Sequence, residues 1–60
     1  MKTAREVAEY LVSKLRGLNE TDAAALLDAA LEGSEPEEIV AIAQHMPPAL
    51  RPLMPKRHLN

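Results

Sequence analysis

The chain has 60 residues and a formal net charge of −2, and it contains no cysteine, tryptophan or phenylalanine. This length allows only one small domain, and the absence of cysteine excludes disulfides and thiolate metal sites. No stretch approaches the ~20 apolar residues that cross a bilayer, and the N-terminus lacks the apolar run of a signal peptide. We therefore expect a cytoplasmic protein with no membrane partner.

The charges fall into three blocks along the chain. Residues 1–18 carry a net charge of +2, residues 19–38 contain seven acidic and no basic residues, and the tail carries +3. Solvated helix faces and acidic first turns of helices explain such blocks in the simplest case. The alternative is that the basic ends dock on the acidic middle, within one chain or between two chains.

The first predicted helix covers about residues 4–16. Thr3 and Glu6 have the T-x-x-E spacing of a capping box. At ~100° per residue, one arc of the helix is apolar; its members are Ala4, Val7, Ala8, Leu11, Val12 and Leu15. Tyr10 and Lys14 lie at one edge of this arc, and Gly17 is placed to end the helix in a left-handed cap.

The second predicted helix covers about residues 20–32 at the centre of the chain. Residues 22–31 consist of alanine, leucine and aspartate, and alanine and leucine are strong helix formers. Asn19 is the expected N-cap, and Gly33 ends the helix. The apolar face comprises Ala23, Ala24, Leu26, Leu27, Ala30 and Leu31, whereas Ala25 and Ala29 face away.

The third predicted helix covers about residues 35–46. Ser34 and Glu37 have the S-x-x-E spacing of a second capping box, and Pro36 fits the first helical turn. The predicted buried stripe comprises Ile39, Val40, Ile42, Ala43 and Met46. Pro47 and Pro48 then stop the helix.

Together these patterns predict an all-α fold, a small three-helix bundle over residues 1–47 followed by a proline-rich extended arm over residues 48–60. The centre of the core should be Leu11, Leu15, Leu27, Leu31, Ile39 and Ile42. The prolines favour an extended or polyproline-like arm, with room for one tight turn at residues 48–51. Leu50, Leu53 and Met54 are too apolar for a simple linker, so we expect them to pack across the first or third helix.

The second and third predicted helices resemble the helix-turn-helix family of DNA-binding motifs. The positions that match are Ala29, Gly33, Ile39 and Ile42. This resemblance implies a DNA-associated regulator. The pattern departs from the family at Asp28, Glu32 and Ser34, where apolar residues are usual, and the reading helix would begin with glutamates, whereas phosphate contacts need lysine and arginine.

Residues 52–57 have the pattern P-x-x-P-x-R and resemble ligands of SH3 domains. In such ligands two prolines of a polyproline helix fit aromatic grooves, and the arginine pairs with an acidic rim. The resemblance implies a protein partner for the arm. The alternative is that the leucines and methionine of the arm fold back as a lid on the bundle.

Residues with the spacing of a catalytic or metal site are absent from the sequence. His45 and His58 have no ligand partner at a suitable spacing, and Asp28 and Glu32, four residues apart, are typical of a solvated helix surface. A chain of this size also leaves little room for a substrate pocket. We expect no enzyme activity, no catalytic residue, no cofactor, no bound metal and no small-molecule substrate.

The most consistent function is a small protein–protein interaction module that acts as a regulator, adaptor or inhibitor and associates with itself. The alternative is a DNA-associated regulator that uses the second and third helices, although nucleic acid is the less favoured partner. A homodimer should form through the first helix or the alanine face of the second. The candidate partner-binding residues are Tyr10, Lys14, Leu50, Leu53, Met54, Lys56 and Arg57.

Overall fold

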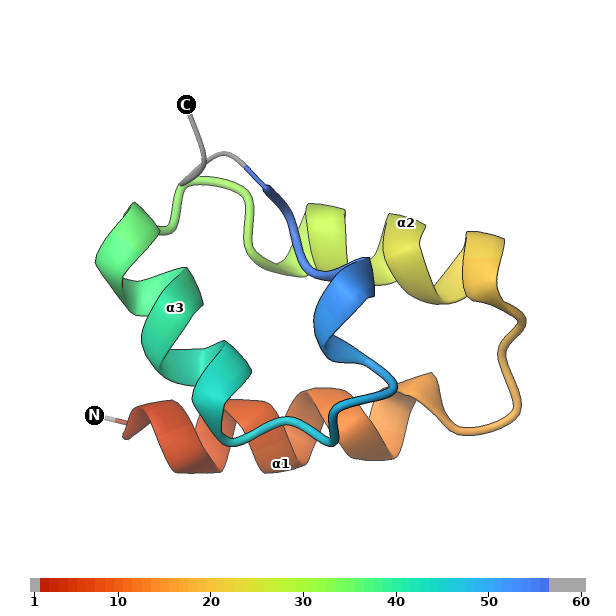
Figure 1. The fold of residues 1–60 in the computed structure, drawn as a ribbon, viewed down its shortest axis with the longest axis horizontal. Helices are drawn as coiled ribbons and strands as arrows, with labels where there is room; N and C mark the ends of the chain where they lie inside the picture. The colour runs from red at the N-terminus through yellow and green to blue at the C-terminus, as the bar shows by residue number, and fades with distance from the viewer. Residues whose placement is uncertain (1, 57–60) are drawn as a thin grey trace.

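In a computed structural model that describes residues 2–56, the chain forms three α-helices and one short 3₁₀ helix, and this part of the chain contains no strand. The elements are α1 (Ala4–Leu15), α2 (Glu20–Ala30), α3 (Pro36–Gln44) and the 3₁₀ helix η1 (Arg51–Leu53). The predicted all-α fold with three helices is confirmed. Figure 1 shows α1 and α2 as the long sides of the molecule, with α3 packed chiefly on α1 and η1 packed against α2.

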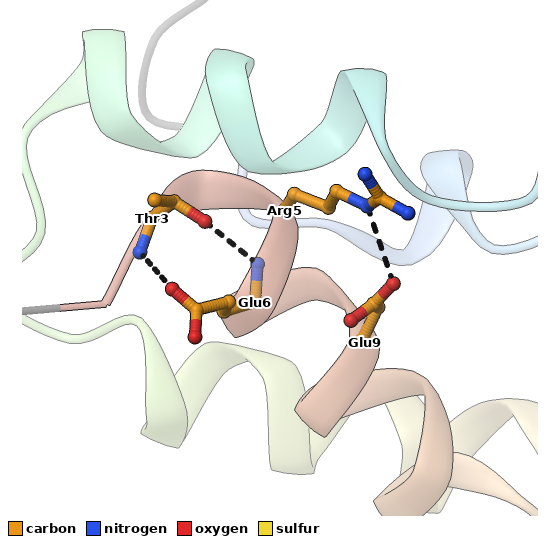
Figure 2. Close-up of polar contacts among 4 residues, drawn as sticks. All are labelled: Thr3, Arg5, Glu6 and Glu9. Atoms are coloured by element: carbon orange, nitrogen blue, oxygen red, sulfur yellow. Dashed lines mark hydrogen bonds and ion pairs between the residues drawn. The ribbon is translucent and has the colours of Figure 1, made fainter.

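The start of α1 is fixed by the predicted capping box. The backbone N–H of Glu6 donates to Thr3 Oγ1 at 3.2 Å, and the N–H of Thr3 donates to Glu6 Oε1 at 3.0 Å (Figure 2). These two bonds satisfy donors that the first helical turn leaves without partners. Gly17 follows α1 in the left-handed conformation that was predicted, with φ +81°. Arg16 before it is extended and the Leu18 N–H donates to Leu15 O at 3.1 Å, so the helix ends in a β-turn and not in a helical cap.

The start of α3 differs from the prediction by one residue. The N-cap is Glu35 and not Ser34, and the N–H of Glu35 donates to Glu38 Oε1 at 2.9 Å. The reason is Pro36, which is the first helical residue and restricts the residue before it to an extended conformation. Glu35 has that conformation, with φ −74° and ψ 152°.

The core joins all three helices and the tail. All six residues predicted for its centre are buried, and Leu27 and Ile39 are fully inaccessible to solvent. Ala8, Ala23, Met46 and Met54 complete the hydrophobic core. Two predicted apolar-face residues are exposed instead, Ala30 on α2 and Val40 on α3. Val40 lies ~100° from Ile39 around the helix, outside the stripe that Ile39, Ile42 and Met46 form.

Over residues 48–53 the tail has the one tight turn that was predicted, but it then forms a short helix where an extended arm was expected. Residues 48–50 form a turn and Arg51–Leu53 form η1, because the fixed φ of a proline suits the first turn of a helix. Met54 is only 4% exposed, and Leu50 and Leu53 pack against the core. The tail does fold back on its own bundle, chiefly against α2. It reaches the expected α3 as well, through hydrogen bonds from Arg51 to the C-terminal end of that helix.

Candidate functional site

The structure separates the candidate partner-binding residues into two groups. Tyr10 and Lys14 lie exposed on α1, and Lys56 is exposed near the end of the described chain. The apolar tail residues, by contrast, turn toward the bundle, and Met54 belongs to its core. Arg57 lies outside the described residues.

The SH3-ligand pattern in the tail is not presented as an extended peptide. Pro52 and Leu53 are part of η1, and Met54 and Pro55 are buried. An SH3 domain recognises exposed prolines on a polyproline helix. The fold-back alternative therefore describes this segment, and the exposed surfaces of α1 and α3 are the better candidates for binding.

On α1, the ring of Tyr10 lies between two lysine side chains. The Nζ atoms of Lys2 and Lys14 are 5.0 Å and 5.4 Å from the ring centroid, within the range of a cation–π interaction. Tyr10 is 51% exposed. We call Lys2, Tyr10 and Lys14 the lysine–tyrosine surface. Lys2 did not stand out in the sequence because it precedes the helix and lies eight residues from Tyr10.

On α3, the exposed side of the helix combines apolar and acidic groups. Val40 is 40% exposed and borders two grooves of 420 and 240 Å³. The larger groove is lined by Pro36, Glu37, Val40, Ala41 and Gln44, and the smaller by Val40, Ala43, Gln44 and Arg51. We call Glu37, Val40, Ala41 and Gln44 the α3 surface; it was missed in the sequence because Val40 was assigned to the buried stripe.

A third groove connects these two surfaces at the contact between α1 and α3. It has a volume of 150 Å³, and its walls are Lys2, Ala4 and Val7 on one side and Glu38, Ala41 and Ile42 on the other. Lys2 also belongs to the lysine–tyrosine surface, and Ala41 also belongs to the α3 surface. A basic and an acidic surface therefore border one shallow apolar groove.

Ion pairing between the charged blocks is sparse. Between residues 2 and 56, the one ion pair within 4.0 Å joins Arg5 Nε to Glu9 Oε2 at 3.4 Å, inside α1 (Figure 2). An exposed pair of this kind contributes little to stability. In the described chain the acidic groups of α2 and α3 form no ion pair with the basic groups of α1. The alternative of basic ends docked on the acidic middle is therefore not realised through ion pairs among residues 2–56.

Glu6 is the group whose titration the fold changes most clearly. The hydrogen bond from the Thr3 backbone N–H, followed by the one with the Thr3 side chain, lowers the pKa of the Glu6 carboxyl below its ordinary value. Both bonds favour the charged carboxylate. Because the side chain lies at the surface, this shift reflects helix capping and not a reactive site.

Arg51 is a structural residue that local patterns in the sequence did not reveal. Its Nε–H points at the carbonyl oxygens of Ala43 and Met46, at 3.1 and 3.2 Å, and Nη2 lies 3.4 Å from the carbonyl oxygen of Gln44. The carbonyls of Ala43 and Gln44 lie at the C-terminal end of α3 and that of Met46 just beyond it, where helical acceptors lack partners from the next turn. Ala43 O also accepts from the Met46 N–H. The guanidinium group thus ties the tail to α3 and closes one end of the groove beside Val40.

Over residues 2–56, no three His, Cys, Asp or Glu side chains converge in a way that would hold a metal ion. His45 lines a groove with Glu9 and Arg16, and it is exposed. None of the helices described is both long and apolar enough to cross a membrane.

Comparison of the chain with known proteins returned no matching family model, no matching curated protein and no matching solved structure.

Proposed function

We propose that the protein is a small, non-enzymatic interaction module that binds other protein surfaces and associates with itself. The observation that carries this proposal is the segregation of charge: residues 1–18 carry a net charge of +2 and residues 19–38 carry seven acidic and no basic residues, yet the single ion pair of the described residues lies within α1. Opposite charges that stay apart within one chain are available to pair between two chains.

Exposed apolar side chains support the same conclusion. Tyr10 and Val40 are two of the three large apolar residues that the described surface exposes. Lys2 and Lys14 lie beside Tyr10, and Glu37 and Arg51 line the grooves beside Val40. Apolar anchors surrounded by polar groups are typical of protein interfaces. A chain of 60 residues without disulfides also gains stability from association, because a fold of this size buries only ~60% of its unfolded surface.

The charges of the exposed helix faces argue against DNA as the partner. In a helix-turn-helix arrangement α3 would approach the duplex by its N-terminal end, where Glu37 and Glu38 are exposed. Carboxylates at that position repel phosphates, whereas binding needs lysine or arginine. Titration with mixed-sequence duplex DNA should therefore show no complex of the kind that phosphate contacts form, whose affinity falls as the salt concentration rises.

Sedimentation velocity tests the proposal directly. Between about 1 µM and about 1 mM protein, the weight-average mass should rise above that of the monomer, because weak dimers populate at micromolar to millimolar concentration. Added salt should shift this rise in mass to higher protein concentration, since salt screens the attraction between surface charges. A monomer mass across the whole range would contradict the self-association.

A further inference from the structure

We propose that the self-association joins the lysine–tyrosine surface of one copy to the α3 surface of a second copy, and reciprocally. This inference rests on the proposed function and assigns the surfaces that carry it. The occupant of the grooves beside Val40 is accordingly the Tyr10 side chain of another copy of this chain.

The two surfaces are complementary in chemistry. Tyr10 offers a half-exposed ring, and Val40 together with Ala41 offers an apolar floor beside the larger groove. Contact between them removes apolar area from water on both sides. Tyrosine suits this role because its ring buries a large apolar area while its hydroxyl group can remain at the wet edge of an interface.

The two surfaces are also complementary in charge. Lys2 and Lys14 stand over the ring of Tyr10, and Glu37 lines the groove beside Val40. None of these three charged groups forms an ion pair within the described chain. When the ring docks beside Val40, the lysines are carried toward the carboxylates at the N-terminal end of α3, and opposite charges meet at the rim of the contact.

The position of the surfaces allows a closed dimer. They lie on the two helices that pack most closely, and the 150 Å³ groove between α1 and α3 has Lys2 on one wall and Glu38 on the other. A twofold axis in the plane of the interface, along this groove, brings α1 of each copy opposite α3 of the other. Adjacent surfaces of opposite charge become self-complementary under such a rotation, so the contact closes as a dimer and does not extend into a fibre.

The size of the chain sets the expected strength. The chain exposes 4289 Å², and a standard interface takes about 800 Å² from each partner. A contact centred on one tyrosine and one valine falls below that standard. The dimer should therefore be weak, and its dissociation should respond to salt because its charges lie at the rim.

The alanine face of α2 is a less supported alternative for the interface. Ala25 and Ala29 are exposed, but the charged residues that flank them, Asp22 and Asp28, are both acidic and would repel each other across a twofold contact. The reversals at Lys14 and Glu37 described next leave this face unchanged, whereas Asp28→Lys changes its charge, so together they separate the two interfaces.

A charge-swap cycle measured by sedimentation equilibrium tests the assignment. Lys14→Glu and Glu37→Lys, each alone, should weaken dimerisation about tenfold at low ionic strength, because each places like charges across the contact. The double variant should restore dimerisation to within a few-fold of the parent. Arg16→Glu and Asp28→Lys, exposed changes of the same charge outside both surfaces, serve as matched controls that leave dimerisation nearly unchanged.

The outcomes distinguish a failure of this interface assignment from a failure of the proposed self-association. A parent protein that stays monomeric contradicts the self-association itself. A parent that dimerises while the double variant stays as weak as the single variants, or while the controls weaken the dimer equally, overturns the assignment of these surfaces and leaves self-association standing. Circular dichroism melts of each variant show that the fold persists, and loss of stability alone cannot produce a rescue in the double variant.

Discussion

Replacing Arg51 with alanine should separate the tail from the end of α3. The guanidinium group bridges residues that are five to eight positions earlier in the chain, at the carbonyls of Ala43, Gln44 and Met46. Those carbonyls carry the negative end of the helix dipole, which favours a cation. In the alanine variant water must satisfy the carbonyls of Gln44 and Met46, whereas Ala43 O keeps its bond from the Met46 N–H. The turn at residues 48–50 then loses its connection to α3.

The size of the effect follows from the geometry. One Nε proton is shared between two acceptors, so these contacts count as one bifurcated bond, and the third contact is long at 3.4 Å. A hydrogen bond from a charged donor contributes about 1.5–3 kcal/mol when shielded, whereas a cation at an exposed helix C-terminus contributes about 0.3–1 kcal/mol. Because Arg51 is exposed, we expect a loss of about 1 kcal/mol.

Thermal unfolding followed by circular dichroism measures this loss. A change of about 1 kcal/mol lowers Tm by about 4–8 °C in a domain of this size. Arg51→Lys is the matched control: it keeps the charge but lacks the planar guanidinium fork, so part of the stability should return. An alanine variant that melts within about a degree of the parent would refute the role given to Arg51.

Three further changes test other parts of the fold. Leu27→Ala should cost about 2–5 kcal/mol in chemical denaturation, because Leu27 is fully buried; a loss below about 1 kcal/mol would show that the core is centred elsewhere. Met54→Ala should destabilise by about 2 kcal/mol as a core residue of the tail, and an unchanged denaturation midpoint would mean that the tail does not dock. The lowered pKa of Glu6 means that its carboxylate stabilises the fold above the pKa of the unfolded chain, and that this contribution is lost as the pH falls through the folded pKa. When the pH is lowered from about 7 to about 3, the Tm of the Glu6→Gln variant should therefore fall less than the Tm of the parent. Equal falls in Tm for the two proteins would contradict this reasoning.

The helices and the core were predictable because their signals are local. Caps such as Thr3 and Asn19 act within three residues, and the spacing of leucine and isoleucine identifies the buried arc of each helix. The error at the start of α3 was local as well. Two overlapping pairs have the spacing of a capping box, Ser34 with Glu37 and Glu35 with Glu38, and Pro36 selects the second pair because it holds Glu35 in an extended conformation.

The tail and the candidate surfaces were less predictable because they depend on contacts between distant residues. The prolines indicated an extended arm, yet burial of Met54 and the contacts of Arg51 with α3 fold it against the bundle. Exposure of Val40 depends on which side of α3 meets the rest of the core, and a stripe of five apolar residues on a nine-residue helix leaves that choice open. The proximity of Tyr10 and Lys14 could be predicted from the sequence, because residues four positions apart are neighbours on the surface of a helix.

The most direct test of the proposed association is an isotope-filtered NOE measurement on a mixture of labelled and unlabelled protein, at a concentration where sedimentation shows dimer. The proposed interface predicts intermolecular cross-peaks between the ring protons of Tyr10 and the methyl groups of Val40. A dimer whose intermolecular cross-peaks involve the α2 alanines Ala25 and Ala29, with none between Tyr10 and Val40, would contradict it.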